Sequence, residues 1–164
     1  MASAEAIVEW IPRLRRYARA LTGDAVSADD LVQDTLARAI EKFALWRAGS
    51  DLRAWLFSVM HNTFVNQLRA RHATETLESD DLEARPRRPD GVLIDLEKCL
   101  RGLPAEQREI ILLIGLEEMS YAEAAQALGV PQGTVMSRLS RARTRLAALM
   151  AGEAPSAATL RVVK

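Results

Sequence analysis

Residues Tyr121–Val135 read YAEAAQALGVPQGTV, and this stretch decides the fold of the second half of the chain. A helical run ends before Gly129, a residue suited to the positive φ of a tight turn, and a second helix is expected directly after that turn. Ala125 is small where the two helices would cross, and Val130 and Val135 can fill the angle between them. A short helix, a three-residue turn containing glycine and a longer helix are typical of a helix-turn-helix.

The helix expected after this turn, residues 132–150, separates apolar from basic residues. Its predicted buried stripe consists of Val135, Leu139, Ala142, Leu146 and Leu149, and its outward positions are Met136, Ser137, Ser140, Arg141 and Thr144. Residues 124–152 contain no Asp or Glu, and their charges are Arg138, Arg141, Arg143 and Arg145. Because arginine can donate two hydrogen bonds to guanine in the major groove, this face predicts DNA binding. The alternative is an amphipathic helix with a solvated arginine face.

Helical spacing of apolar residues continues through the rest of the chain. We predict helices over residues 7–21, 29–43 and from Asp51 onward, with Gly23 ending the first and residues 24–28 forming a turn. The predicted inward stripes are Leu31, Leu36, Ile40 and Phe43 in the second helix, and Leu52, Trp55, Leu56, Val59, Thr63 and Leu68 in the third. Further helices are expected over residues 92–100, 105–117 and 120–128. No strand pattern of useful length is present, so the predicted fold class is all-α.

Residues 72–90 divide the chain into two halves. They contain two prolines, many charges and only two large apolar residues, a composition typical of a flexible linker. We therefore expect one small helical domain over residues 1–71 and a second over residues 91–150, each packing its own small core. The tail, residues 151–164, is rich in alanine and is expected to be disordered.

The overall composition excludes several classes of protein. The net charge is zero, with 22 basic and 22 acidic residues, so bulk attraction to nucleic acid is not expected. The lone cysteine, Cys99, cannot form an internal disulfide, and no signal peptide or bilayer-spanning run is present, which predicts a cytoplasmic protein without membrane insertion. The two histidines, His61 and His72, lie near no ligand cluster and no phosphate-binding loop occurs. We expect no metal, no cofactor and no catalysis.

Several motifs in a fixed order resemble the sigma-70 family, specifically its extracytoplasmic-function (ECF) group. In the second half the similar stretches are LPAEQREI from Leu103, SYAEAA from Ser120 and LGVPQGTVMSRLSRAR from Leu128, which look like region four. In the first half they are DLVQDT from Asp30 and LRAWLFSVMHN from Leu52, which look like region two. The resemblance covers nearly the whole chain and implies two helical domains joined by a linker.

The resemblance implies a DNA-reading role for the second half. The positions that match the family's readers of the minus-thirty-five element are Met136, Ser137, Ser140 and Arg141. Thr134, Arg138 and Arg143 complete the expected contact set, with the flanking arginines holding phosphates. Many relatives carry a basic residue where this chain has Met136, which hints at a different preferred sequence.

For the first half, the resemblance implies capture and opening of the minus-ten element. The loop 44–51 resembles one that holds a flipped base, where Trp46 could stack and Arg47 and Ser50 could donate hydrogen bonds. Alternatively, Trp46 covers the domain core. The helix that follows carries the remaining candidate DNA contacts, which are Arg53, Asn62, Asn66, Arg69 and Arg71. Arg53 has a second possible role, an ion pair with Asp51 or Glu41.

A third surface is implied for polymerase binding. The outward residues Asp30, Gln33 and Asp34 would contact the clamp helices of the largest polymerase subunit. Without the resemblance, a solvated face that also caps its helix would be the simpler interpretation.

The function that follows is that of an ECF sigma factor, monomeric when free, whose partners are core RNA polymerase, promoter DNA and an anti-sigma factor. Two weakly binding modules on a tether gain affinity once polymerase holds both, so the free protein should bind promoters poorly. Two alternatives remain: a stand-alone helix-turn-helix repressor or activator, and a mimic that uses this fold to sequester a regulator. A repressor would bind its operator without polymerase, whereas a mimic would start no transcripts.

Overall fold

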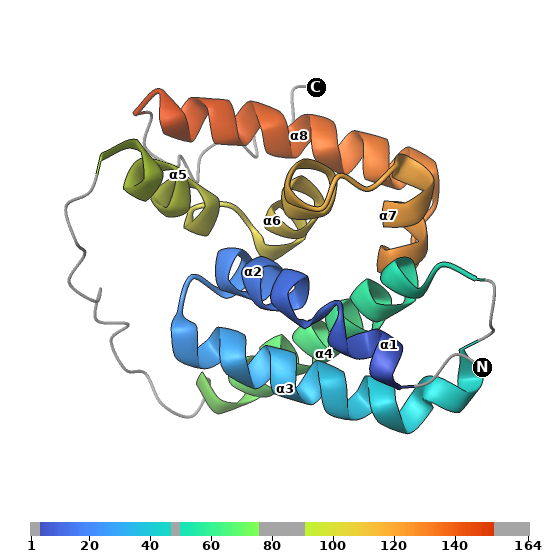
Figure 1. The fold of residues 1–164 in the computed structure, drawn as a ribbon. Helices are drawn as coiled ribbons and strands as arrows, with labels where there is room; N and C mark the ends of the chain where they lie inside the picture. The colour runs from blue at the N-terminus through green and yellow to red at the C-terminus, as the bar shows by residue number, and fades with distance from the viewer. Residues whose placement is uncertain (1–3, 47–49, 76–90, 153–164) are drawn as a thin grey trace.

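The computed structural model describes residues 4–46, 50–75 and 91–152, and within these ranges the chain contains helices and no strands. The first half consists of α1 (Glu5–Val8), α2 (Ile11–Thr22), α3 (Ala25–Lys42), the short 3-10 turn η1 (Phe43–Leu45) and α4 (Leu52–Glu75). The second half consists of α5 (Gly91–Arg101), α6 (Ala105–Ile111), the π-helical turn η2 (Leu112–Leu116), α7 (Tyr121–Leu128) and α8 (Gln132–Met150). Figure 1 shows the second half lying along α2 and α4. The predicted all-α fold class is confirmed.

The connection between α2 and α3 is shorter than the sequence predicts. Gly23 ends α2 with a φ of 71°, and its N–H donates to the carbonyl of Arg19. The carboxylate of Asp24 accepts hydrogen bonds from the N–H groups of Val26 and Ser27, so α3 begins at Ala25. The turn predicted for residues 24–28 is wrong because Asp24 is the N-cap and the helix starts directly after it.

The inward face of α3 is also rotated from the predicted stripe. Leu31 is buried as expected, but Ile40 is 59% exposed. The positions that face the core are Ala28, Leu31, Val32, Thr35 and Ala39. Small side chains on this face allow α3 to lie close against α2 and α4.

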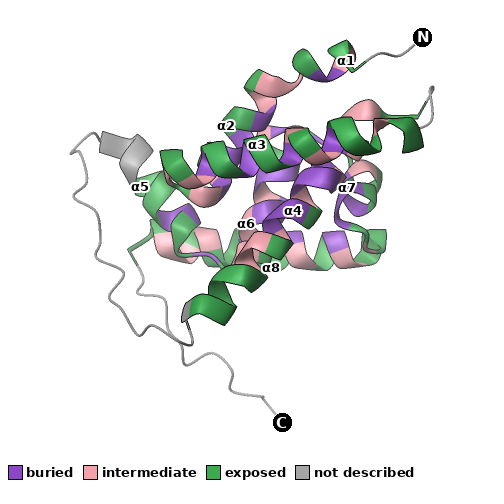
Figure 2. Cartoon of the chain, turned by 90° about the horizontal axis from the view of Figure 1, so that it is seen from below, coloured by how far each residue is buried: buried purple, intermediate pink, exposed green. Residues whose placement is uncertain are grey.

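The longest helix, α4, is buried on more than one side, as the colours of Figure 2 show. Leu56 and Val59 pack with Ile7 and Ala39 in a small cluster of the first half. The next face of α4 carries Phe57, Met60 and Phe64, which belong to a larger cluster. A single-sided stripe therefore accounts for only part of the packing of this helix.

This larger cluster extends through both halves of the molecule. From the first half it contains Leu14, Tyr17, Leu21, Leu31 and Phe57, and from the second half Leu100, Leu103, Ile110, Leu113 and Leu128, among others. The Tyr17 and Phe57 rings meet edge to face with centroids 5.0 Å apart. The expectation that each half packs a separate core is wrong, because α7 lies against α4, and α5 and η2 lie against α2.

The ends of the two halves are placed as follows. α4 continues to Glu75, so residues 72–75 of the predicted linker are helical, and α5 begins at Gly91. The rest of the predicted linker, residues 76–90, and the tail from residue 153 lie outside the described residues. Among the residues that are described, no helix is long and apolar enough to cross a membrane.

Candidate nucleic-acid interface

The helix-turn-helix is held by local capping at both ends of α7. The Ser120 hydroxyl accepts from the Glu123 N–H at 3.1 Å, and the Glu123 carboxylate accepts from the Ser120 N–H at 3.0 Å. This reciprocal pair is a capping box. Gly129 ends α7 with a φ of 66°, and its N–H donates to the carbonyl of Ala125. The predicted glycine turn is therefore present, and it fixes the angle between α7 and α8.

On α8 the predicted division between buried and outward residues is confirmed. Val135, Leu139 and Ala142 are buried, and Leu146 and Leu149 pack partly against the core. The outward side chains are exposed, and they are Met136, Ser137, Ser140, Arg141, Arg143 and Thr144. A row of exposed side chains of this kind can enter a major groove.

Two arginines of α8 have different surroundings. Arg141 Nε lies 3.3 Å from the Ser137 carbonyl oxygen and Nη2 lies 3.4 Å from Ser137 Oγ, so the guanidinium stays along the outward face. Arg138 is half-buried, with Nη2 4.0 Å from Glu106 Oε1 on α6. Thr134 is also half-buried. Of the two arginines, Arg141 is the one displayed toward an approaching duplex.

The residues predicted for the minus-ten element are spread over two segments. Trp46 is half-buried and stacks on Phe43 with ring centroids 5.5 Å apart. Its Nε1 atom is buried and has no hydrogen-bond partner among the described residues. Ser50 is exposed, whereas Arg47 lies outside the described residues. Trp46 therefore touches Phe43, a residue that itself packs against the small cluster of the first half.

Along α4 the polar candidates remain open to solvent. Asn62, Asn66 and Arg69 are exposed. Arg71 donates from Nη2 to Ser27 Oγ at 3.0 Å, which ties the end of α4 to α3. The three exposed residues occupy successive turns of one helix, a spacing compatible with contacts along a DNA backbone.

Arg53 is directed away from solvent and toward the second half of the chain. Its Nη2 atom lies 2.5 Å from Glu123 Oε2, and Nη1 donates to the Glu117 carbonyl at 3.2 Å. The partners predicted from the sequence, Asp51 and Glu41, are not those that the structure gives. Asp51 instead accepts from the N–H of Ala54 at the start of α4, in the manner of an N-cap. In this arrangement Arg53 is engaged by the helix-turn-helix.

The predicted polymerase surface lies on the outer side of α3. Asp30, Gln33 and Asp34 are all exposed and share one face of the helix. Asp34 Oδ2 accepts a hydrogen bond from Gln67 Nε2 of α4 at 2.8 Å. The three side chains form a polar patch that is not required for core packing.

The contact between the two halves contains buried ionisable side chains that the sequence did not reveal. Glu117 is fully buried, with Oε2 3.2 Å from Arg13 Nε and Oε1 3.5 Å from Arg16 Nη2. Among the described residues neither carboxylate oxygen has a partner with hydrogen-bond geometry, so these two contacts are ion pairs without a hydrogen bond. Glu109 is 3% exposed, and its two oxygens lie 2.8 and 3.0 Å from His61 Nδ1. The feature of the sequence that could have indicated these buried acids is their position on either side of the apolar run Ile110–Ile114.

Two further groups at this contact have shifted pKa values. Burial, reinforced by the carboxylates of Glu109 and Glu117, raises the pKa of Tyr17 well above its usual value. Burial next to Arg101 lowers the pKa of Arg108, and Glu109 partly offsets that effect. Arg108 Nη1 donates to the Leu21 carbonyl at 2.7 Å, at the end of α2.

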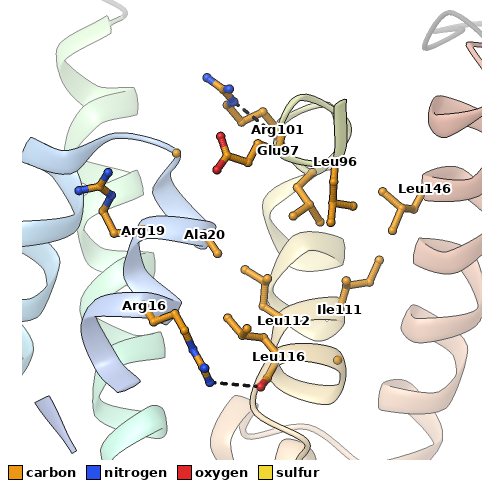
Figure 3. A pocket seen from close by; sticks show the side chains of 13 residues that line it. Arg16, Arg19, Ala20, Leu96, Glu97, Arg101, Ile111, Leu112, Leu116 and Leu146 are labelled. Carbon is orange, nitrogen blue, oxygen red and sulfur yellow. Dashed lines mark hydrogen bonds between the residues drawn. The ribbon is translucent and has the colours of Figure 1, made fainter. Parts of the chain in front are cut away.

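A groove of about 740 Å³ also runs between the halves, and Figure 3 shows its walls. Its apolar floor comes from α5, α6, η2 and α8 and includes Leu100, Leu112 and Leu146. Arg16 and Arg19 of α2 and Arg101 of α5 lie on the rim, with Glu97 as the acidic member of the lining. The groove can therefore accept an apolar surface that carries acidic groups.

Comparison with known families assigns a description to each half. Residues 7–61 match the family described as the Sigma2 domain of PhyR. Residues 93–146 match the family described as Sigma-70, region 4. The ECF RNA polymerase sigma factor EcfG of Rhodopseudomonas palustris is 39% identical over 88% of this chain and 82% of its own length. The factor SigM of Mycobacterium tuberculosis is 33% identical over 84% of this chain and 71% of its own.

Solved structures resemble the chain over almost its whole length. The sigma factor RpoE, in complex with the anti-sigma factor NepR from Bartonella quintana, has a TM-score of 0.79 and 38% identity, over 90% of this chain and 95% of its own. CnrH in complex with the cytosolic domain of CnrY has a TM-score of 0.69 and 27% identity, over 92% of this chain and 88% of its own. The anti-anti-sigma factor PhyR from Bartonella quintana shares the fold at 21% identity, and the match covers 48% of that chain.

Proposed function

This chain belongs to the family of ECF RNA polymerase sigma factors, and from that premise we propose how its surfaces direct transcription initiation. It binds core RNA polymerase, directs the enzyme to specific promoters and helps to open the DNA. The polymerase supplies the catalysis, and we place the site of action in the cytoplasm, with core polymerase. The observation that carries this proposal is that one chain exposes both the outward side chains of α8 and the polar residues Asp30, Gln33 and Asp34 of α3.

We assign the minus-thirty-five element to α8. Arg141, held along the helix by Ser137, is positioned to donate to a guanine edge, while Ser140 permits close approach of the helix. Met136 is 53% exposed and presents an apolar surface suited to a thymine methyl group. Thr134, Arg138 and Arg143 hold the flanking backbone, and Arg138 must leave Glu106 to do so. The Arg138 contact with DNA thus depends on a change in the position of its side chain.

We assign the minus-ten element to the edge of η1 and to α4. Trp46 offers its half-buried ring to a base extruded from the duplex, while its indole N–H, which is buried and has no hydrogen-bond partner among the described residues, would have to turn outward to reach that base. Arg47, Ser50 and Arg53 would surround that base, and Asn62, Asn66 and Arg69 would follow the strand. Extruding a base costs a few kcal/mol of stacking, so these side chains are needed together.

The decisive experiment is transcription in vitro with purified core polymerase and a genomic library as template. The expected result is a set of transcript starts that share two upstream elements at a fixed spacing. A stand-alone repressor would instead shift DNA without polymerase, and a mimic of the kind represented by PhyR would bind a regulator and start no transcripts. Starts without a shared upstream sequence would refute the proposal.

The polymerase contact has its own test in Asp34→Ala. Loss of this exposed carboxylate should weaken core binding, measured by competition for core enzyme, about tenfold, with unchanged helical circular dichroism. Glu41→Ala removes an equally exposed acid two turns further along α3 and serves as the matched control. Equal core affinity for both variants would remove Asp30, Gln33 and Asp34 from the contact.

We further propose that an anti-sigma factor binds this chain at the arginine-rimmed groove. Two of its structural relatives were solved with such partners, NepR and CnrY, and the groove combines an apolar floor with Arg16, Arg19 and Arg101. An amphipathic helix with acidic flanks satisfies both features. NepR from Bartonella quintana is a suitable probe: Arg19→Glu should weaken its binding at least tenfold, whereas Arg15→Glu, exposed on α2 outside the groove lining, should not. Equal losses of NepR affinity for both variants would exclude the groove as the binding site.

A further inference from the structure

The methionine side chains of this chain differ widely in exposure. Of its five methionines, all but Met1 lie in the described residues. Met60 and Met119 are 0% and 4% exposed, whereas Met136 and Met150 are 53% and 55% exposed. A thioether is oxidised only where an oxidant reaches its sulfur, so exposure decides which of these side chains is reactive. In the described part of the chain, oxidation should therefore be confined to Met136 and Met150.

The two exposed methionines lie at opposite ends of α8. Met136 is in the second turn of this helix and Met150 is its last residue, so they are about 21 Å apart along the axis. In a helix-turn-helix, the N-terminal residues of the second helix contact the base edges. Ser140 lies one turn from Met136 on the same exposed face. An oxygen atom added to Met136 would thus face the DNA, whereas one added to Met150 would not.

Neither exposed side chain contributes to the described core. Met136 and Met150 belong to neither of the two apolar clusters, whereas Met60 and Met119 are members of the larger one. A polar atom on the sulfur of Met136 should therefore leave the helices and their packing intact. Its effect should fall on DNA recognition and not on stability.

We propose that Met136 is an oxidation-sensitive modification site, at which conversion of the thioether to the sulfoxide prevents reading of the upstream promoter element. This inference rests on the proposed function, because it takes Met136 as part of the minus-thirty-five contact. The oxidant belongs to the class that transfers one oxygen atom and accepts two electrons, represented by hypochlorous acid. The S–O bond forms with an electron pair of the sulfur, the O–Cl bond breaks, and chloride and a proton leave. Methionine sulfoxide reductase reverses the step with two thiols, giving the thioether, a disulfide and water.

The sulfoxide differs from the thioether in the property that the DNA contact uses. The unoxidised Met136 side chain is apolar and flexible, so it can lie against a thymine methyl group without losing hydrogen bonds to water. The sulfoxide oxygen accepts hydrogen bonds from water, and the same contact would remove that water without replacing it. Oxidation therefore weakens the sequence-specific complex, whereas the backbone contact of Arg143 is retained.

The test oxidises the purified chain with hypochlorous acid, stops the reaction with free methionine, and only then adds core polymerase. Peptide mass spectrometry should find an added oxygen atom on Met136 and Met150 and none on Met60 or Met119. Promoter binding by the treated holoenzyme should fall at least about fivefold and should recover when the chain is first reduced by methionine sulfoxide reductases. Binding to a template with a scrambled upstream element should not change.

Two substitutions assign the effect to one sulfur. Met136→Leu should show no loss on treatment, measured against its own untreated holoenzyme, because leucine has no sulfur to oxidise. Met150→Leu, matched in exposure and on the same helix, should lose binding as the wild type does and recover in the same way. Oxidation of Cys99, which is 8% exposed, would be common to all three proteins and cancels in the comparison.

Two results would overturn the inference: equal losses for Met136→Leu and the wild type, or an oxidised Met136 with unchanged promoter binding. A Met136 no more oxidised than Met60 would overturn it as well. If Met136→Leu failed to bind the promoter before treatment, loss and recovery in Met150→Leu would decide, because Met136 is then the exposed methionine that remains among the described residues. An untreated wild-type holoenzyme that starts no transcripts would instead refute the proposed function, and the oxidation pattern would remain interpretable.

Discussion

Gly129 has a backbone conformation that other residues adopt only with strain. Its φ is 66°, and a Cβ atom there would meet nothing within 4 Å. Gly129→Ala should therefore lower the free energy of unfolding by about 1–2 kcal/mol through backbone strain alone. Gly133, in the first turn of α8, is equally unobstructed but has no positive φ, so Gly133→Ala should be neutral or raise stability by up to about 1 kcal/mol. Urea unfolding measures both, and equal effects would contradict the assignment.

Arg141 is the residue on which specificity at the upstream element should depend most. Arg141→Ala should cost about 1–3 kcal/mol of binding to the cognate element and reduce discrimination against a scrambled one. Arg143→Ala should weaken both sequences to the same extent, because a phosphate contact carries no sequence information. Promoter binding by the polymerase holoenzyme, measured on both templates, distinguishes these outcomes. If Arg141→Ala, like Arg143→Ala, weakened binding to the cognate and the scrambled element equally, Arg141 would contact the DNA backbone and not a base.

At the scale of single elements, α7 depends on its capping box. Ser120→Ala removes the hydroxyl that accepts from the Glu123 N–H and should destabilise the protein by about 1 kcal/mol. Ser58→Ala, in the second turn of α4, should be neutral, since within the described part of the chain that hydroxyl donates to the Trp55 carbonyl of its own helix and to no other group. Thermal unfolding followed by circular dichroism provides the comparison. A neutral Ser120→Ala would mean that the contact with α4 alone holds α7.

Element boundaries could be predicted where the signal is local. Ser120, Gly129 and Pro131 specify α7 and the start of α8 through capping and turn chemistry, and the structure agrees. The start of α3 was missed because residues 24–28 were assigned to a turn, whereas Asp24 caps a helix that starts as soon as α2 has ended at Gly23. Ile40 was misassigned for a related reason, since the same helical spacing allows a neighbouring face to be the buried one.

At the scale of the whole molecule, the shared core predicts a single unfolding transition. All three tryptophans, Trp10, Trp46 and Trp55, lie in the first half, so fluorescence reports that half, whereas circular dichroism reports both. The two signals should change at the same temperature, and Phe57→Ala should shift both together by removing about 3–5 kcal/mol. A second transition seen by circular dichroism alone would show that the halves unfold independently.

The sequence by itself determined the all-α class, the helix-turn-helix, the outward face of α8 and the membership of a family, because these depend on spacing, capping and motif order along a short stretch. It also located the candidate contacts with DNA and polymerase, most of which the structure leaves exposed.

Only the tertiary structure decided how the halves lie against each other. The partners of Glu117 are about a hundred residues away, and Arg53 pairs across the molecule with Glu123 and not with nearby acids. Periodicity shows which face of a helix is apolar but not which distant helix covers it, and a charge looks the same in a sequence whether it is solvated or buried beside a partner. The way in which the two halves pack together therefore depends on contacts between distant segments, and the local sequence pattern of one segment contains no information about the other.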